Sequence, residues 1–183
     1  QRALHFMTPA GGVLWDCISL VDDATVAALQ TLGGVTAIAI SHPHFYSSMV
    51  DWSRALGGVP VYVHALDRAW AVRHDPTIRY WEGATLAIAP GATLIHCGGH
   101  FAGSTVLHWA DGAGGLGAIL VGDTIMVGQD RRTVSFMYSY PNLIPLNASA
   151  VRRIAAALEP YEFEQIFGGW SGKNILEGGK QAL

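Results

Sequence analysis

Three histidines and one aspartate in this sequence have the residue types and the spacing of metal ligands. His42 and His44 are separated by a single residue, His100 lies in a glycine-rich segment, and Asp123 stands between Gly122 and Thr124. Imidazole and carboxylate groups are ligands that Zn²⁺ accepts, and iron or manganese tolerates the same set. We therefore predict a divalent metal site formed by His42, His44, His100 and Asp123. Zinc is the expected ion, and its bound water would ionise near pH ~7.

Each of these residues comes soon after an apolar stretch that predicts a buried strand. The mostly β-branched run 34–40 precedes His42, the run 93–96 precedes the His100 segment, and the run 118–122 precedes Asp123. Strands that end at one edge of a sheet can deliver their following residues into one space. Three neutral histidines need no metal to fold, however, so an empty pocket stays open as an alternative.

The rest of the chain alternates predicted strands and helices, which is typical of an α/β fold. Asp22 and Asn147 are suited to cap helices, and glycine pairs follow the first two predicted helices. The segment 127–146 shows no regular pattern, which is typical of a functional or mobile loop. We predict strands at 3–7, 12–16, 34–40, 60–64, 81–89, 93–96, 105–110, 118–122 and 164–167, and helices at 22–32, 47–56, 66–73 and 147–158.

Length and composition favour one domain over residues 1–183 that takes a small-molecule substrate. Hydrophobic residues make up 50% of the chain and charged residues 14%, which indicates extensive buried sheet or a contact with another subunit, so a homo-oligomer stays open. The net charge of −3 gives no electrostatic case for nucleic acid or an anionic membrane. No apolar run reaches the ~20 residues of a membrane span, and no signal peptide is visible. Two cysteines make no disulfide framework, so we expect a cytoplasmic protein.

The motifs and their order resemble the metallo-β-lactamase superfamily over nearly the whole chain. The run Val13–Asp16 is similar to the family's first motif, an aspartate that closes a strand. Ser41–His44 matches the first half of the His-x-His-x-Asp-His motif. His96–Ser104 is similar to the family segment that carries the third histidine, and Gly122–Thr124 to its Gly-Asp-Thr. Phe167–Gly169 resembles the approach to the last histidine.

The resemblance implies an α/β fold of four layers, an αββα sandwich with the metal site at one edge of its two sheets. It also implies hydrolysis of an ester, amide, thioester or phosphoester by metal-activated water. The family fold has several strands before the first aspartate motif, whereas only residues 1–15 precede Asp16 here. We therefore expect a first sheet that is reduced, completed by another chain, or short of some N-terminal strands.

Departures from the family motifs predict a weakened site. Tyr46 stands at the aspartate of the metal motif, Ser47 at the following histidine, and Trp170 at the last metal-binding histidine. We therefore expect at most one metal ion, with Asp123 at its edge.

Two residues are catalytic candidates at this weakened site. Asp123 is one if it acts as the base, and Tyr46 is the other if its hydroxyl donates to a developing oxyanion. An aromatic plug is the equal alternative for Tyr46. The leading function is a metal-dependent hydrolase, and the alternative is an inactive relative that binds a ligand or a partner. Arg131 and Arg132 would suit an anionic substrate group if they face the site, although a solvated loop pair is the simpler interpretation.

Overall fold

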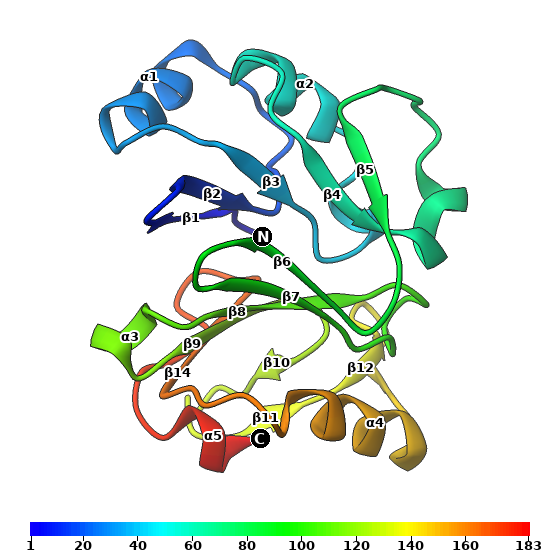
Figure 1. Cartoon of the computed structure of the whole chain (residues 1–183). Helices are drawn as coiled ribbons and strands as arrows, with labels where there is room; N and C mark the ends of the chain where they lie inside the picture. Colours follow the sequence, from blue (N-terminus) through cyan, green and yellow to red (C-terminus); the bar gives the residue numbers. More distant parts are fainter.

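The computed structural model describes all residues from 1 to 183, and it consists of two β-sheets packed face to face with helices on both outer faces. Helices α1 and α2 cover the first sheet, and α4 and α5 cover the second (Figure 1). The predicted four-layer αββα sandwich is therefore confirmed.

The first sheet has five strands in the order β1-β2-β3-β4-β5. Strands β1 and β2 form an antiparallel hairpin, as predicted, and β2 to β5 are parallel neighbours. The bounds are β1 Leu4–Thr8, β2 Gly11–Trp15, β3 Ala37–Ala39, β4 Val61–His64 and β5 Ile78–Trp81.

The second sheet has six strands in the order β15-β14-β9-β8-β7-β6. All its pairs are antiparallel except β14 with β9, which is parallel. The bounds are β6 Thr85–Ala89, β7 Ala92–His96, β8 Thr105–Trp109, β9 Ala118–Gly122, β14 Gln165–Gly168 and β15 Asn174–Ile175.

Side chains at the helix starts explain where the two longest helices begin. Asp22 accepts a hydrogen bond from the Thr25 amide at 2.8 Å, and Asn147 accepts one from the Ala150 amide at 2.9 Å. The helices are α1 Asp23–Thr31, α2 Met49–Ala55, α3 Gly112–Gly115, α4 Ala148–Leu158 and α5 Gly179–Ala182, with 3₁₀ turns η1 Pro43–Phe45 and η2 Ala65–Trp70. No helix has the length and apolar character that crossing a membrane requires.

Alternation along the strands divides the core into three layers. In β3, Ile38 packs in the cluster under α1 and α2, whereas its neighbour Ala39 packs between the sheets. In β9, Ile119 packs under α4 and Leu120 packs between the sheets. Successive side chains of a strand point to opposite faces, so strands that are apolar throughout fill two interfaces at once.

Strand direction brings the candidate ligands to one edge. The parallel strands β2 and β3 end side by side before Asp16 and Ser41. Strands β7 and β9 both run antiparallel to β8, so they also end at a common edge. The Thr105 amide donates to the Ser41 carbonyl at 2.9 Å and joins the edges of the two sheets.

Three segments differ from the sequence prediction. The helix expected at 66–73 is the shorter 3₁₀ turn η2, which ends at Trp70. The single strand expected at 81–89 is two strands in different sheets, because Gly83, with φ of 92°, lets the chain cross between them. The irregular segment 127–146 contains two short hairpins, β10 Met126–Val127 with β11 Val134–Ser135, and β12 Met137–Ser139 with β13 Ile144–Pro145.

Candidate metal centre

The structure brings together the four residues that the sequence predicts as metal ligands. One ligand atom from each of His42, His44, His100 and Asp123 lies within 4.8 Å of all the others. The Oδ2 atom of Asp123 lies 3.4 Å from His42 Nε2, 3.8 Å from His44 Nδ1 and 4.0 Å from His100 Nε2. Three nitrogens and one carboxylate oxygen therefore face a common point.

A buried relay fixes the orientation of His42. The Ser41 hydroxyl donates to Asp16 Oδ2 at 2.9 Å, and its oxygen lies 2.8 Å from His42 Nδ1. When Asp16 is ionised, the hydroxyl proton goes to its carboxylate and the oxygen accepts from Nδ1–H, which leaves a lone pair on Nε2. Burial lowers the pKa of His42 to about 4, so the ring is neutral at pH 7. Asp16 is therefore linked to His42 through Ser41 and is not itself among the gathered ligand atoms.

Backbone carbonyls fix His100 in the same way. Its Nδ1 lies 3.2 Å from the Met137 carbonyl oxygen and 3.0 Å from that of Tyr138. Two acceptors place the proton on Nδ1, so Nε2 presents a lone pair to the centre. That Nε2 atom is buried and has no hydrogen-bond partner. Burial lowers the pKa of His100, which also keeps the ring neutral.

Asp123 lies behind the three imidazoles with its carboxylate almost fully buried. Burial alone would raise its pKa, but the contact with His42 and the interactions with the neighbouring His100 and His44 imidazoles outweigh burial and lower it. The Gln1 side chain donates to Oδ2 at 3.2 Å, whereas Oδ1 has no partner. The Tyr140 hydroxyl donates to the Asp123 carbonyl oxygen at 2.8 Å.

The donor set fits a divalent metal ion. His42 Nε2 and His44 Nδ1 lie 3.1 Å apart, and two lone pairs at that distance repel unless a proton or a cation lies between them. His100 Nε2 and Asp123 Oδ1 are buried without partners, which costs free energy that a bound cation recovers. Neutral imidazoles with a carboxylate are ligands of zinc, iron and manganese.

Asp67 helps to hold the loop that carries His100. This fully buried carboxylate accepts from the Gly103 amide at 2.9 Å through Oδ1. The same loop is held by Ser104, whose hydroxyl oxygen accepts from the Phe101 amide at 2.8 Å, and by His96, whose Nε2 donates to the Ala102 carbonyl at 2.8 Å. No motif marks Asp67, so sequence reasoning missed it.

The three residues at lost ligand positions lie in different surroundings. The ring of Tyr46 is buried with Phe45 and Met49 in the cluster under α2, and it is not one of the gathered side chains. Ser47 is exposed, and the Trp170 ring lies 6.2 Å from that of Tyr140. The position of Tyr46 favours the aromatic plug over an oxyanion donor.

An open cleft of about 410 Å³ leads to the centre. It is lined by His44 and His100 and by the rings of Trp70, Phe101, Tyr138 and Tyr140. The side chain of His44 is 48% exposed, whereas His42 is fully covered, so His44 is the ligand on the open side.

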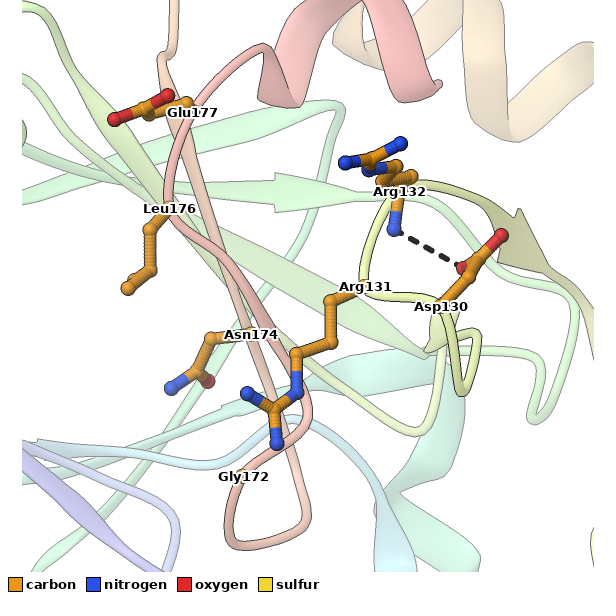
Figure 2. A pocket seen from close by; sticks show the side chains of 7 residues that line it. All are labelled: Asp130, Arg131, Arg132, Gly172, Asn174, Leu176 and Glu177. Atoms are coloured by element: carbon orange, nitrogen blue, oxygen red, sulfur yellow. Dashed lines mark hydrogen bonds between the residues drawn. The ribbon is translucent and has the colours of Figure 1, made fainter.

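Arg131 and Arg132 line a different pocket, of about 390 Å³, that shares no residue with this cleft. Figure 2 shows the Arg131 side chain extending toward Gly172 and Asn174, whereas Arg132 turns away from them. The pair therefore does not face the cleft at the metal centre, which was the condition for its binding an anionic group of the substrate there, and the simpler interpretation of a loop pair is the one that fits. Cys97 is also inert, because it is buried and burial raises the pKa of its thiol to about 12.

Comparison with known sequences leaves the activity open. No family model matches the chain. The uncharacterized protein YmaE of Bacillus subtilis (strain 168) is 48% identical over 171 residues, which cover 93% of this chain. The chain spans 62% of the length of that curated relative.

Solved structures identify the fold. The protein TTHA1623 in a di-iron-bound form superimposes with a TM-score of 0.69 at 24% identity, over 98% of this chain and 91% of its own. A B3 metallo-β-lactamase with an active-site glutamic acid gives 0.64 at 15% identity, over 97% and 77%. An N-acyl homoserine lactone hydrolase with the product N-hexanoyl-L-homoserine at its catalytic metal centre gives 0.61 at 18% identity, over 90% and 78%.

Proposed function

We propose that this chain, which has the metallo-β-lactamase fold, is a hydrolase that uses one divalent metal ion, zinc in the first instance, held by His42, His44, His100 and Asp123. The observation that carries the proposal is the convergence of three imidazole nitrogens beside Asp123, two of which, on His42 and His100, direct lone pairs inward. Hydrogen-bond partners on the far side of His42 and His100 fix those lone pairs. A divalent metal in such a site supplies a Lewis acid and a water that ionises near pH ~7.

The chain's own residues supply the rest of the chemistry. The relay from His42 through Ser41 to Asp16 holds one imidazole rigidly, and the Met137 and Tyr138 carbonyls hold another. Asp123 Oδ2 lies 3.4 Å from His42 Nε2, 3.8 Å from His44 Nδ1 and 4.0 Å from His100 Nε2, so Asp123 is the carboxylate that would accept a proton at the centre if it does not bind the metal. The substrate carbonyl would enter through the cleft on the His44 side.

The test starts from protein purified without added metal. Elemental analysis should find up to one ion per chain. Chelation followed by addition of zinc, iron or manganese should restore the hydrolysis of at least one ester, lactone, thioester or phosphodiester. His100→Ala should lose both metal and turnover, whereas the exposed His74→Ala should keep both. A His100 variant with unchanged activity and metal content would place the site elsewhere.

An inactive, ligand-binding protein is the second candidate. The burial of Tyr46 favours it, because no carboxylate stands at that position of the metal motif to orient a water. Metal that binds stoichiometrically, with no turnover on any substrate of the panel, would support this alternative.

A further inference from the structure

We propose that the cleft beside His44 and His100 selects uncharged substrates with an apolar acyl group, and this inference rests on the proposed function of the same site. The lining of the cleft contains no lysine, arginine, aspartate or glutamate. Arg131 and Arg132 line a different pocket, and Arg68, which is near Trp70 in sequence, lies over the Tyr80 ring at 4.1 Å. No side-chain cation is therefore present in the cleft to bind a carboxylate or a phosphate.

Several polar groups around the cleft already have partners, and the hydroxyls that remain without one, on Tyr138 and Ser139, are uncharged. The Tyr140 hydroxyl donates to the Asp123 carbonyl, so this residue presents its ring to the cleft. The carbonyls of Met137 and Tyr138 face Nδ1 of His100. What the walls offer a ligand is mainly the apolar surface of aromatic rings.

These rings are fixed in position yet accessible. Phe101 packs edge-on against Trp70 with centroids 5.5 Å apart, and edge-on against His44 and His100 at 5.0 Å each. Trp70 remains 59% exposed and Tyr138 61% exposed. An apolar group that covers these exposed aromatic rings removes apolar area from water, which makes its binding beside the metal centre favourable.

The substrate class follows from these two features. Its reacting group is an uncharged carbonyl of the ester, lactone or thioester type, and its acyl chain lies against Trp70, Phe101 and Tyr138. Hydrolysis forms one carbon–oxygen bond from water and breaks the bond to the leaving group, which takes up a proton. A phosphodiester or a substrate with a carboxylate on its acyl chain would have to lose hydration without gaining a protein cation.

The first experiment uses the metal-loaded protein and p-nitrophenyl esters of acetate, butyrate and hexanoate. We expect kcat/KM to rise with chain length, by up to about fourfold for each fully buried methylene. Matched six-carbon esters that end in a carboxylate or a trimethylammonium group should fall below hexanoate. Trp70→Ala should flatten the dependence on chain length, whereas Leu116→Ala, an exposed leucine outside the cleft, should keep it. A preference for either charged ester would overturn the proposal and leave the hydrolase assignment intact.

The second experiment needs neither metal nor turnover. Chelated protein is titrated with 1-hexanol, 1-octanol and sodium hexanoate while tryptophan fluorescence is recorded. We expect saturable binding that is tighter for octanol than for hexanol, weakest for hexanoate, and without the fluorescence change in Trp70→Phe. This outcome would support the apolar cleft even for a protein without turnover. No saturable signal from the alcohols, or hexanoate binding as tightly as hexanol, would overturn it.

Discussion

The carboxylate of Asp16 accepts two hydrogen bonds from Ser41, one from the backbone amide at 2.7 Å and one from the hydroxyl at 2.9 Å. Asp16 directly follows β2 and Ser41 lies just beyond β3, so the pair ties two neighbouring strand ends together. Asp16 has a φ of 62°, a backbone region in which aspartate and asparagine are enriched. The direction of these two bonds decides which nitrogen of His42 carries a proton.

We predict that Asp16→Asn weakens metal binding although the side chain keeps its shape. The Ser41 amide requires the amide oxygen of the new residue, so its NH₂ group must face the Ser41 hydroxyl. The hydroxyl then donates to His42 Nδ1, and the proton moves to Nε2, where the metal would bind. Metal affinity should fall about 10–100-fold, as for other outer partners of metal ligands. Titration with zinc against a competing chelator measures this effect, and an unchanged affinity would refute the relay.

Asp16 also predicts a pH dependence of stability in the metal-free protein. Burial raises its pKa to about 8, whereas the unfolded carboxyl titrates near ~3.9. Between these values the folded metal-free state keeps a proton that the unfolded state releases, so stability falls as pH rises, and the relay that prepares His42 for a metal forms when that proton is lost. The slope should reach up to about 1.4 kcal/mol per pH unit.

The window from pH 7 to 8 isolates this contribution. The buried histidines His42 and His100 have lowered pKa values, so their opposite contribution ends near pH ~6.5. Urea unfolding of the wild type should show a loss of stability from pH 7 to pH 8 that is absent in Asp16→Asn. Equal slopes for the two proteins would mean that Asp16 is already ionised at pH 7.

The gathering of the four candidate ligands was predictable because each comes soon after a strand whose apolar pattern is visible in the sequence. The passage of the chain from one sheet to the other at Gly83 was not predictable. Apolar residues continue on both sides of Glu82 and Gly83, so the sequence looks like one strand. A sequence pattern shows burial, and it does not show which of two facing sheets buries the residue.

The partners of the ligands were only partly predictable. Asp16 belongs to a motif that is visible in the sequence. His100, in contrast, is oriented by the backbone carbonyls of Met137 and Tyr138, which any residue type would supply. The irregularity of segment 127–146 predicts a functional or mobile loop, but its contacts with His100 come from tertiary packing alone. The role of Asp67 depends on a single backbone amide and leaves no trace in residue spacing.

Substitution of Tyr46 tests whether this residue is a plug. We predict that Tyr46→Phe keeps metal affinity within about twofold, because the ring packs under α2 and the hydroxyl is not among the gathered ligand groups. Tyr46→Ala should cost about 3–5 kcal/mol of unfolding free energy, as removal of a buried aromatic ring does. Urea unfolding and zinc titration on both variants make the comparison. A Phe variant that loses turnover while it folds and binds metal normally would restore the hydroxyl as a catalytic group.

Removal of the Asp67 carboxylate should loosen the loop of His100. Asp67→Ala leaves the Gly103 amide buried without an acceptor, at a cost of about 1–3 kcal/mol. We expect weaker zinc binding together with the loss of stability, because the loop then holds His100 less rigidly. Asp67→Asn keeps an oxygen for the amide and should restore most of the affinity. If Asp67→Ala binds zinc as tightly as wild type, the hydrogen bond between the Gly103 amide and Asp67 is not needed to position His100.

The last prediction concerns Gly122, which lies where the two sheet edges meet. It has a φ of 51°, and a Cβ atom there would lie 2.4 Å from the Ser41 hydroxyl oxygen and 2.6 Å from Ser41 Cβ. Gly122→Ala must therefore displace Ser41, which breaks the relay to His42. We expect a loss of zinc affinity and of stability, beyond the strain of about 1 kcal/mol or more for a side chain at this φ.

A second variant separates the displacement of Ser41 from the backbone strain. Gly57 also has a positive φ, of 90°, but nothing lies within 4 Å of its Cβ position. Gly57→Ala should therefore lose stability and keep zinc affinity, measured by the same titration. If Gly122→Ala folds and binds zinc like Gly57→Ala, the position of Ser41 does not control His42, and the relay from Asp16 has no part in forming the metal centre.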